Sequence, residues 1–430
     1  MKDFIDYLKR LTQNKSAKNV IWILSERLIQ MLISFFVTII SMRYLGPSNF
    51  GLISYVTSIT ALFTAVVNLG INNILIKRLV QNREKNGELI GSSVLLQVIS
   101  GFLSFLMVLM IVVILKPGNH LLFIITILHS ISLLFAFYNL FDLWFQSNLN
   151  SKYVSIAKAI SYLIISTYKI LLLMYQKPVE WFAFTNTIEA FVLCLLLIYM
   201  YYKNGGQKLS FSFETAKSLF HESHHFILSS LLITLYTTVD RVMLGTILSE
   251  NEVGLYGAAV ATAGLWNFIS EAIINSMKSV IYSAKKENDD RGFYHQQRVL
   301  FSLIFWINFG FGLVTFIFSK LIIQILYGEA YLGATVALMI CAWYPMLAYL
   351  VAARETWIIA NDLHSYVKKF SLFGAVSNIM LNSLLIPSQG IVGAAIATII
   401  SQLIVLGSAA LFKPVRPVIK CIIDGILLRN

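Results

Sequence analysis

Long runs of apolar residues recur along almost the whole chain. Each run has about 19–25 residues, which is enough for a helix to cross a hydrocarbon core of about 30 Å. Charged residues make up 13% of the 430 residues and hydrophobic residues 57%, whereas soluble proteins carry roughly 25% charged residues. The sequence therefore predicts an all-α integral membrane protein of about twelve transmembrane helices.

The predicted spans begin and end where the apolar runs meet charged or turn-forming residues. They cover residues 19–42, 50–73, 90–115, 121–145, 153–175, 179–202, 224–247, 255–279, 299–318, 332–353, 368–386 and 390–411. The connections on the outer side are all short, and the longest is expected around residues 319–331.

The two halves of the chain share a motif. Gly51 and Gly254 each stand at the start of an even-numbered span, six spans apart, so both halves have the same orientation, as in parallel repeats. This predicts two six-helix lobes related by a pseudo-two-fold repeat. The expected divisions are an amphipathic cytoplasmic helix (1–18), an N-lobe (19–202), a cytoplasmic linker (203–223), a C-lobe (224–412) and a cytoplasmic tail (413–430).

Loop charge predicts the orientation of these spans. The net charge is +12, and most of the 33 lysines and arginines lie on the side of the two chain ends. Each Lys or Arg is assigned here to its nearest span end. The opposite side then has only Arg43, Lys116, Lys169, Lys177 and Lys320, and Arg27 and Arg241 are assigned to neither side. Because cytoplasmic loops are enriched in Lys and Arg, both termini are expected on the cytoplasmic side of the membrane.

Polar side chains recur at helical spacing in four spans. In the repeat, the first span corresponds to the seventh and the second to the eighth. The polar residues are Arg27, Gln30, Ser34, Thr38 and Ser41 in the first, Ser54, Thr57, Thr64 and Asn68 in the second, Ser230, Thr234, Thr237 and Arg241 in the seventh, and Asn267, Glu271, Asn275 and Lys278 in the eighth. In hydrocarbon such a stripe must face protein or water. Hydrogen bonds between helices, worth roughly 0.6 kcal/mol each, are one explanation. The accompanying charges favour a wet central cavity between the lobes.

The cations inside the spans are candidates for binding an anion. Arg27 lies about 12 Å into its span, where facing lipid would cost several kcal/mol; pairing with Glu26 or another acid is the alternative. Arg241 adjoins Asp240 and could pair locally or extend to the interface. Lys158 and Lys169 are three turns apart on one helical face.

Acids inside the spans are candidates for coupling to an ion. Glu189 and Glu271 lie deep enough to carry a coupling proton or to pair with the cations, and Asp240 is a third candidate. Asp142, near a span end, is expected to be structural.

No cofactor or metal is predicted, and the chain is not expected to be an enzyme. His221, His224 and His225 have no acid or cysteine set around them, and no GxxxxGK[ST] loop is present. Cys194, Cys341 and Cys421 are far apart and form no metal or disulfide motif.

Several motifs together resemble the polysaccharide-transporter flippases, which belong to the multidrug/oligosaccharidyl-lipid/polysaccharide exporter superfamily. The resemblance covers nearly the whole chain, and its motifs are residues 43–51 (RYLGPSNFG), 68–71 (NLGI) with Arg78, 240–245 (DRVMLG), 253–256 (VGLY) and 390–395 (GIVGAA).

This resemblance implies alternating access in two six-helix lobes around a V-shaped cavity. The implied substrate is an undecaprenyl-diphosphate-linked oligosaccharide, moved from the inner to the outer leaflet for O-antigen, capsule or teichuronic-type polymers. It also implies a polysaccharide polymerase and a chain-length regulator as partners, and no nucleic acid. The diphosphate would be held by Arg27 and Arg241 and by Lys158 and Lys169, with Gln30 and Asn68 as further substrate-binding candidates.

Two other functions compete with the flippase. A drug/cation antiporter of the same superfamily needs acids toward a cationic substrate, but the deep residues include at least as many cations as acids. A membrane glycan polymerase, which is an enzyme, typically carries a large outer loop, and no such loop is predicted here.

Overall fold

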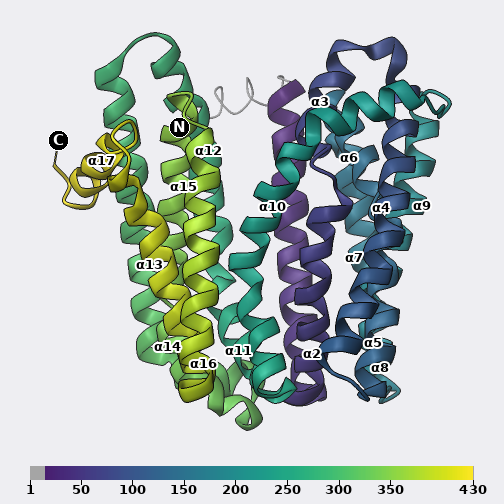
Figure 1. Cartoon of the computed structure of the whole chain (residues 1–430), viewed down its shortest axis with the longest axis vertical. Helices are drawn as coiled ribbons and strands as arrows, with labels where there is room; N and C mark the ends of the chain where they lie inside the picture. Colours follow the sequence, from purple (N-terminus) through teal and green to yellow (C-terminus); the bar gives the residue numbers. More distant parts are fainter. Residues whose placement is uncertain (1–14, 430) are drawn as a thin grey trace, which may run out of the picture. The chain divides into compact units, whose positions relative to one another are not determined.

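Helices account for all the regular structure in the described part of the chain (Figure 1). The computed structural model describes the backbone of residues 15–429 and the side chains of residues 36–429 except 73 and 229. The chain divides into two compact units. Unit 1 comprises the described residues up to Leu45 together with Val56–Leu231, and unit 2 comprises Gly46–Tyr55 together with the described residues from Leu232 onward.

The first half of the chain supplies most of unit 1. Its helices are α2 (Lys15–Val67), α3 (Asn72–Gln81), η1 (Arg83–Lys85), α4 (Asn86–Leu115), α5 (His120–Ser130), η2 (Ile131–Phe135), α6 (Tyr138–Ser147), α7 (Ser151–Met174), α8 (Val179–Ala183) and α9 (Thr185–Lys203). Phe141, Phe145 and Tyr201 are buried at the centre of its apolar core. Helix α10 (Phe213–Ile247) begins in unit 1 and ends in unit 2.

The second half of the chain supplies most of unit 2. Its helices are α11 (Glu250–Ala263), η3 (Gly264–Trp266), α12 (Asn267–Lys286), α13 (Asp290–Tyr327), η4 (Glu329–Ala334), α14 (Thr335–Cys341), α15 (Tyr344–Ala360), α16 (Ser365–Gly407), η5 (Ser408–Leu411) and α17 (Pro417–Ile426). Phe293, Phe301 and Phe370 are buried in its core.

The helices confirm the predicted fold class of an all-α, multi-pass membrane protein. Within the described residues, nine helices are long and apolar enough to cross a membrane, or ten if the bent pair formed by Glu329–Cys341 and Tyr344–Ala360 is one span. The number twelve stays a prediction. Two of the helices, α2 and α16, each contain a glycine with non-helical backbone angles.

These two breaks fall where the sequence predicts separate spans. Gly46 has φ 70° and ψ 171° beside Pro47, and Gly390 has φ 59° and ψ −135° shortly after Pro387. A positive φ is accessible to glycine without steric cost, and proline removes a helical hydrogen bond. Each break therefore joins two helices that the predicted spans treat separately.

The glycine motif of the repeat permits a close helix contact in unit 2. A Cβ atom on Gly51 of α2 would overlap the carbonyl oxygen of Glu250. Reciprocally, a Cβ atom on Gly254 of α11 would overlap the carbonyl oxygen of Pro47. The hydroxyl groups of Tyr55 and Thr246 are 3.1 Å apart and hydrogen-bonded. The paired glycines thus bring the first turns of two helices into backbone contact.

The segment that precedes α10 packs on α4 in unit 1. The N–H of Gly87 donates to Oε1 of Gln207 at 2.8 Å, and the N–H of Ser210 donates to the carbonyl of Gly87 at 3.3 Å. A side chain on Gly87 or Gly91 would overlap this segment. Most of the predicted linker 203–223 is therefore held by hydrogen bonds or belongs to α10.

In unit 2 the structure differs from the sequence-based expectation at one connection and shows one buried cation. The outer connection expected around residues 319–331 is largely helical, because α13 continues to Tyr327 and ends at Gly328, which has φ 87°. Arg354, assigned by loop charge to the cytoplasmic end of a span, is 1% exposed within α15. Its Nη1 donates to the carbonyl oxygens of Val405 and Leu406 at 2.5 and 3.1 Å.

Candidate functional site

The carboxylate of Asp240 is buried in unit 2 and held by hydrogen bonds. The side chain is 5% exposed, on the last two turns of α10. The hydroxyl of Tyr256 on α11 donates to Oδ2 of Asp240 at 2.6 Å, and the N–H of Arg241 donates to Oδ1 at 2.8 Å. Burial of a carboxylate in an apolar surrounding is costly unless such donors compensate it. These contacts fix the position of Asp240.

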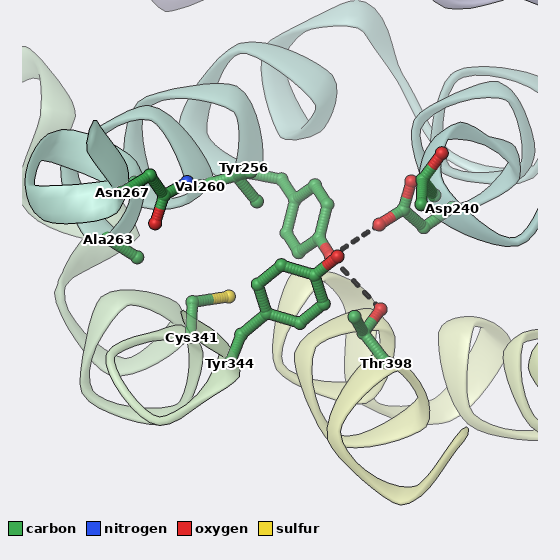
Figure 2. A pocket seen from close by; sticks show the side chains of 10 residues that line it. Asp240, Tyr256, Val260, Ala263, Asn267, Cys341, Tyr344 and Thr398 are labelled. Carbon is green, nitrogen blue, oxygen red and sulfur yellow. Dashed lines mark hydrogen bonds between the residues drawn. The ribbon is translucent and has the colours of Figure 1, made fainter. Parts of the chain in front are cut away.

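A pocket opens beside this carboxylate (Figure 2). Its cavity volume is about 70 Å³, well below the roughly 300–1,000 Å³ of sites for drug-sized ligands, so it has room for a water molecule or a small cation. Its polar lining residues are Thr237, Asp240, Tyr256, Asn267, Tyr344 and Thr398, and Cys341 also lines it. Carboxylate, hydroxyl and amide oxygens are ligands for a hard cation or partners for a proton.

Tyr256 connects the carboxylate to a third helix. Its hydroxyl oxygen lies 3.3 Å from the hydroxyl of Thr398 on α16 as well as within reach of Asp240 (Figure 2). Tyr256 is completely buried. One phenol group therefore ties α10, α11 and α16 together at the pocket.

The side chain of Arg241 is half-buried next to Asp240. The two side chains interact electrostatically, since the positive charge of Arg241 acts on the carboxylate of Asp240. One predicted anion-binding residue and one predicted ion-coupling residue, adjacent in the sequence, therefore also interact through their side chains.

In unit 1, both predicted anion-binding lysines of α7 interact with a carboxylate. Nζ of Lys158 on α7 lies 3.0 Å from Oδ2 of Asp142 on α6, and Nε2 of Gln146 donates to the other carboxylate oxygen at 2.8 Å. Lys169 on α7 and Glu189 on α9 are both half-buried and interact electrostatically. Each of the two lysines predicted on one face of α7 therefore interacts with one acidic residue.

Asn68 takes part in a turn that belongs to one of the sequence motifs. It follows α2 directly, and Leu69 and Gly70 then have φ of 48° and 67°. A Cβ atom on Gly70 would press against the carbonyl oxygen of Ser223 at 2.5 Å. The motif thus forms a turn that lets α10 approach, while Oδ1 of Asn68 is buried without a hydrogen-bond partner.

The remaining predicted site residues lie apart from these groups or outside the described part. Glu271 on α12 accepts a hydrogen bond from the hydroxyl of Tyr349 at 3.3 Å. The side chains of Arg27 and Gln30 lie outside the described residues. His224 has its ring Nδ1 2.7 Å from the carbonyl oxygen of His221.

The sequence does not single out several residues that the structure places at or near the pocket. Tyr256 and Tyr344 resemble the aromatic residues common in membrane helices, and Thr398 is one threonine in an apolar run. Only the position of Tyr256 in a repeated glycine motif sets it apart. Glu355, also missed, interacts electrostatically with Arg354 and Lys278.

Comparison with solved structures shows the fold. An inward-facing multidrug resistance MATE family transporter of the MOP superfamily has a TM-score of 0.71 at 14% identity, with 92% of this chain and 96% of that chain covered. The lipid II flippase MurJ in an inward closed conformation has a TM-score of 0.66 at 14% identity, with 95% and 90% covered. The chain has the fold that these transporters share.

Two curated relatives are similar in sequence. A Haloferax volcanii protein named "Probable low-salt glycan biosynthesis flippase Agl15" is 28% identical over 192 residues, which are 44% of this chain and 40% of the relative. An Escherichia coli (strain K12) protein, named as a candidate O-antigen transporter, is 22% identical over 291 residues, which are 66% of this chain and 68% of the relative. The match thus spans less than half of the first relative's length.

The family to which the chain belongs follows from a longer match. A model of the family described as "Polysaccharide biosynthesis protein" matches residues 16–282. This segment includes Gly51 and Gly254, the Lys158–Asp142 ion pair and the Asp240–Tyr256 contact. The chain belongs to the polysaccharide biosynthesis protein family.

Proposed function

We propose that this protein is a flippase that moves a polyprenyl-diphosphate-linked oligosaccharide from the inner to the outer leaflet by alternating access. The family, the flippase and transporter names of the two relatives and the fold shared with a lipid II flippase support this proposal. In this proposal the protein transports its substrate and catalyses no reaction.

One structural observation carries the proposal: cations inside apolar helices are paired with carboxylates. Nζ of Lys158 lies 3.0 Å from Oδ2 of Asp142, and Lys169 and Arg241 interact electrostatically with Glu189 and Asp240. An unpaired cation in a membrane helix is costly, and a carboxylate partner offsets that cost while no substrate is bound. A diphosphate is an anion of higher charge than a carboxylate, so it can replace the carboxylates as partner of the same cations. Arg27, Gln30 and Asn68 complete the proposed substrate-binding set.

Replacement of the carboxylates by diphosphate suggests how a proton could be coupled to transport. A carboxylate that loses its cation inside a membrane is stabilised by taking up a proton. Glu189, Asp240 and Glu271 are the proposed coupling residues, and the pocket beside Asp240 gives a proton or small cation a place to enter. An inside-negative potential favours outward movement of negative charge by about 2.3 kcal/mol per charge per 100 mV.

The location and partners of the protein complete the proposal. We place it in the bacterial plasma membrane with both termini in the cytoplasm, because loop charge favours that orientation. A polysaccharide polymerase and a chain-length regulator would act on its product. We propose that the N-lobe (19–202) and the C-lobe (224–412) are the two halves that alternate in access.

A drug/cation antiporter is the second candidate, and the oxygen-lined pocket at Asp240 favours it. An organic cation would need an accessible carboxylate, whereas Asp240 is 5% exposed and accepts two hydrogen bonds. We therefore rank the antiporter below the flippase. A drug-resistance assay in cells that express the protein separates the two, because only the antiporter raises the tolerated drug concentration.

Export of surface polysaccharide in a deletion strain tests the flippase directly. The strain is complemented with the wild type, Arg241→Ala, Arg27→Ala or Arg291→Ala; Arg291 is an exposed arginine outside the proposed sites and serves as the control. We expect loss of surface polymer in the first two variants, although both reach the membrane, and normal polymer in the control. Normal polymer in both Arg27→Ala and Arg241→Ala would remove these residues from the binding site.

A further inference from the structure

The C-terminal helix α17 has a fixed position on α13. Val418, Cys421, Ile422 and Gly425 are the buried residues of α17, and they recur at the i, i+3, i+4, i+7 spacing of one helical face. A Cβ atom on Gly425 would lie 2.7 Å from the carbonyl oxygen of Arg298, so the two helices approach closely. Figure 1 shows α17 beside α13 in unit 2.

Two hydrogen bonds from α13 also reach the end of α17. Nε1 of Trp306 donates to the carbonyl oxygen of Ile426 at 3.3 Å, and Nη1 of Arg298 donates to the carbonyl oxygen of Arg429 at 3.4 Å. Residues 413–429 therefore do not form a loose tail, and the outer face of α17 is presented in a defined orientation.

The outward surface around α17 is strongly basic. Three adjoining depressions are lined by five cationic side chains, Arg298, Lys413, Arg416, Lys420 and Arg429, and by one acidic side chain, Asp424. Four of the cations are exposed and Arg298 is half-buried. We call these five residues the α17 basic face; its excess of positive charge suits an anionic ligand.

Large apolar side chains are exposed beside the same cations. Leu411 is 71% exposed, Ile423 48%, Leu427 53% and Leu428 67%. Exposing these apolar side chains to water is unfavourable. The boundary between lipid headgroups and acyl chains accommodates apolar and cationic side chains together. Trp306, which is 48% exposed and contacts α17, is a residue type enriched at that boundary.

The chain connectivity places α17 at the depth of the headgroups. The candidate span Ser365–Leu411 ends six residues before Pro417, the first residue of α17. Six residues reach at most about 20 Å even when fully extended. The α17 basic face therefore lies where a phospholipid headgroup meets the end of this span.

We propose that the α17 basic face binds the headgroup phosphate of an anionic phospholipid, whose acyl chains lie against Ile423, Leu427 and Leu428. The cations attract the phosphate, and the exposed apolar residues distinguish a lipid from a soluble anion. This inference does not depend on which substrate the protein transports.

Association with spin-labelled lipid tests this proposal on the full-length protein. The protein is reconstituted into phosphatidylcholine vesicles that contain a trace of spin-labelled phosphatidylglycerol or of spin-labelled phosphatidylcholine. The fraction of motionally restricted label gives the preference for the anionic lipid. We expect the wild type to prefer phosphatidylglycerol by about threefold or more, because each basic residue near the surface contributes to the attraction.

Two matched triple variants separate a site from general surface charge. K413Q/R416Q/K420Q removes three exposed cations of the basic face, and K286Q/R291Q/K368Q removes three exposed cations elsewhere in unit 2. We expect the first variant to lose the preference and the second to keep it. The variant K413R/K420R preserves the positive charges and should keep the preference for phosphatidylglycerol. It controls for effects of changing these side chains other than the loss of charge.

Three outcomes would overturn the proposal. They are no preference for phosphatidylglycerol in the wild type, an unchanged preference in K413Q/R416Q/K420Q, and an equal loss in both triple variants.

Discussion

The phenol of Tyr256 donates a hydrogen bond of 2.6 Å to the carboxylate of Asp240, and both residues are buried. They come from different helices, α10 and α11, sixteen residues apart in the chain. The contact borders the pocket in unit 2 and neighbours the cation Arg241. It is therefore both a structural link and part of the proposed coupling site.

Removal of this hydroxyl should destabilise the protein. In Tyr256→Phe, the carboxylate of Asp240 loses its side-chain donor from α11, and a buried polar group without its partner costs about 1–3 kcal/mol. We expect a lower thermal unfolding temperature in detergent. Tyr175→Phe, which changes an exposed tyrosine (70%), should leave the temperature unchanged. Equal unfolding temperatures for the wild type and Tyr256→Phe would show that the hydrogen bond is not needed for stability.

The ion pair Lys158–Asp142 should be coupled in a double-mutant cycle. Lys158→Met leaves the carboxylate of Asp142 without its cation, and we expect a loss of about 1–3 kcal/mol in unfolding free energy, less than for a fully buried pair because both groups are partly exposed. The double variant Lys158→Met/Asp142→Asn should recover part of this loss. Additive effects of the two single changes would contradict the pairing.

The backbone contact at Gly254 should not tolerate a methyl group. Gly254→Ala places a Cβ atom against the carbonyl of Pro47, so unfolding free energy should fall by about 1–3 kcal/mol or folding should fail. Gly310 is the matched control, since a Cβ atom there meets nothing within 4 Å inside α13. Gly310→Ala should be neutral or stabilising by about 0.5–1 kcal/mol. Equal behaviour of the two variants would exclude the close contact.

The thiol of Cys421 should be unreactive in the folded protein. Burial raises its pKa to about 12, and the thiolate is the reactive form. Because the pKa of an exposed thiol is near 8.5, at pH 8 the unfolded chain should react with maleimide about 10³-fold faster than the folded protein. The rate for the unfolded chain should level off above about pH 9, whereas the slow rate for the folded protein should still rise at pH 10. A variant with Cys194→Ser and Cys341→Ser isolates the signal. Rapid labelling of the folded variant at pH 8 would contradict the buried position.

The sequence predicts the membrane-spanning architecture because apolar run length reports directly on bilayer thickness. Even the breaks inside α2 and α16 coincide with predicted span boundaries, since Gly46 and Gly390 follow or neighbour prolines. The expected loop around 319–331 is wrong because Lys320 and Gln324 are compatible with a continuing helix.

The candidate site is less predictable because its contacts join different helices. Arg354 at the end of an apolar run has the sequence signature of a cytoplasmic cation, yet its partners are carbonyls of Val405 and Leu406, about fifty residues away. Asp142 was expected to be structural and pairs with Lys158. Local spacing identifies polar residues inside spans, but it does not reveal which of them meet.

The central claim is that cations of the apolar helices carry a diphosphate-linked glycan across the bilayer. Proteoliposomes that contain the purified protein and a fluorescent polyprenyl-diphosphate oligosaccharide measure this directly, with an impermeant glycosidase that reports the glycan on the outer surface. We expect the wild type to expose the glycan faster under a potential negative on the side from which it departs, and Arg241→Ala to be slower by about tenfold or more. Equal rates for wild-type and protein-free vesicles, or no effect of the potential and of Arg241→Ala, would contradict the account.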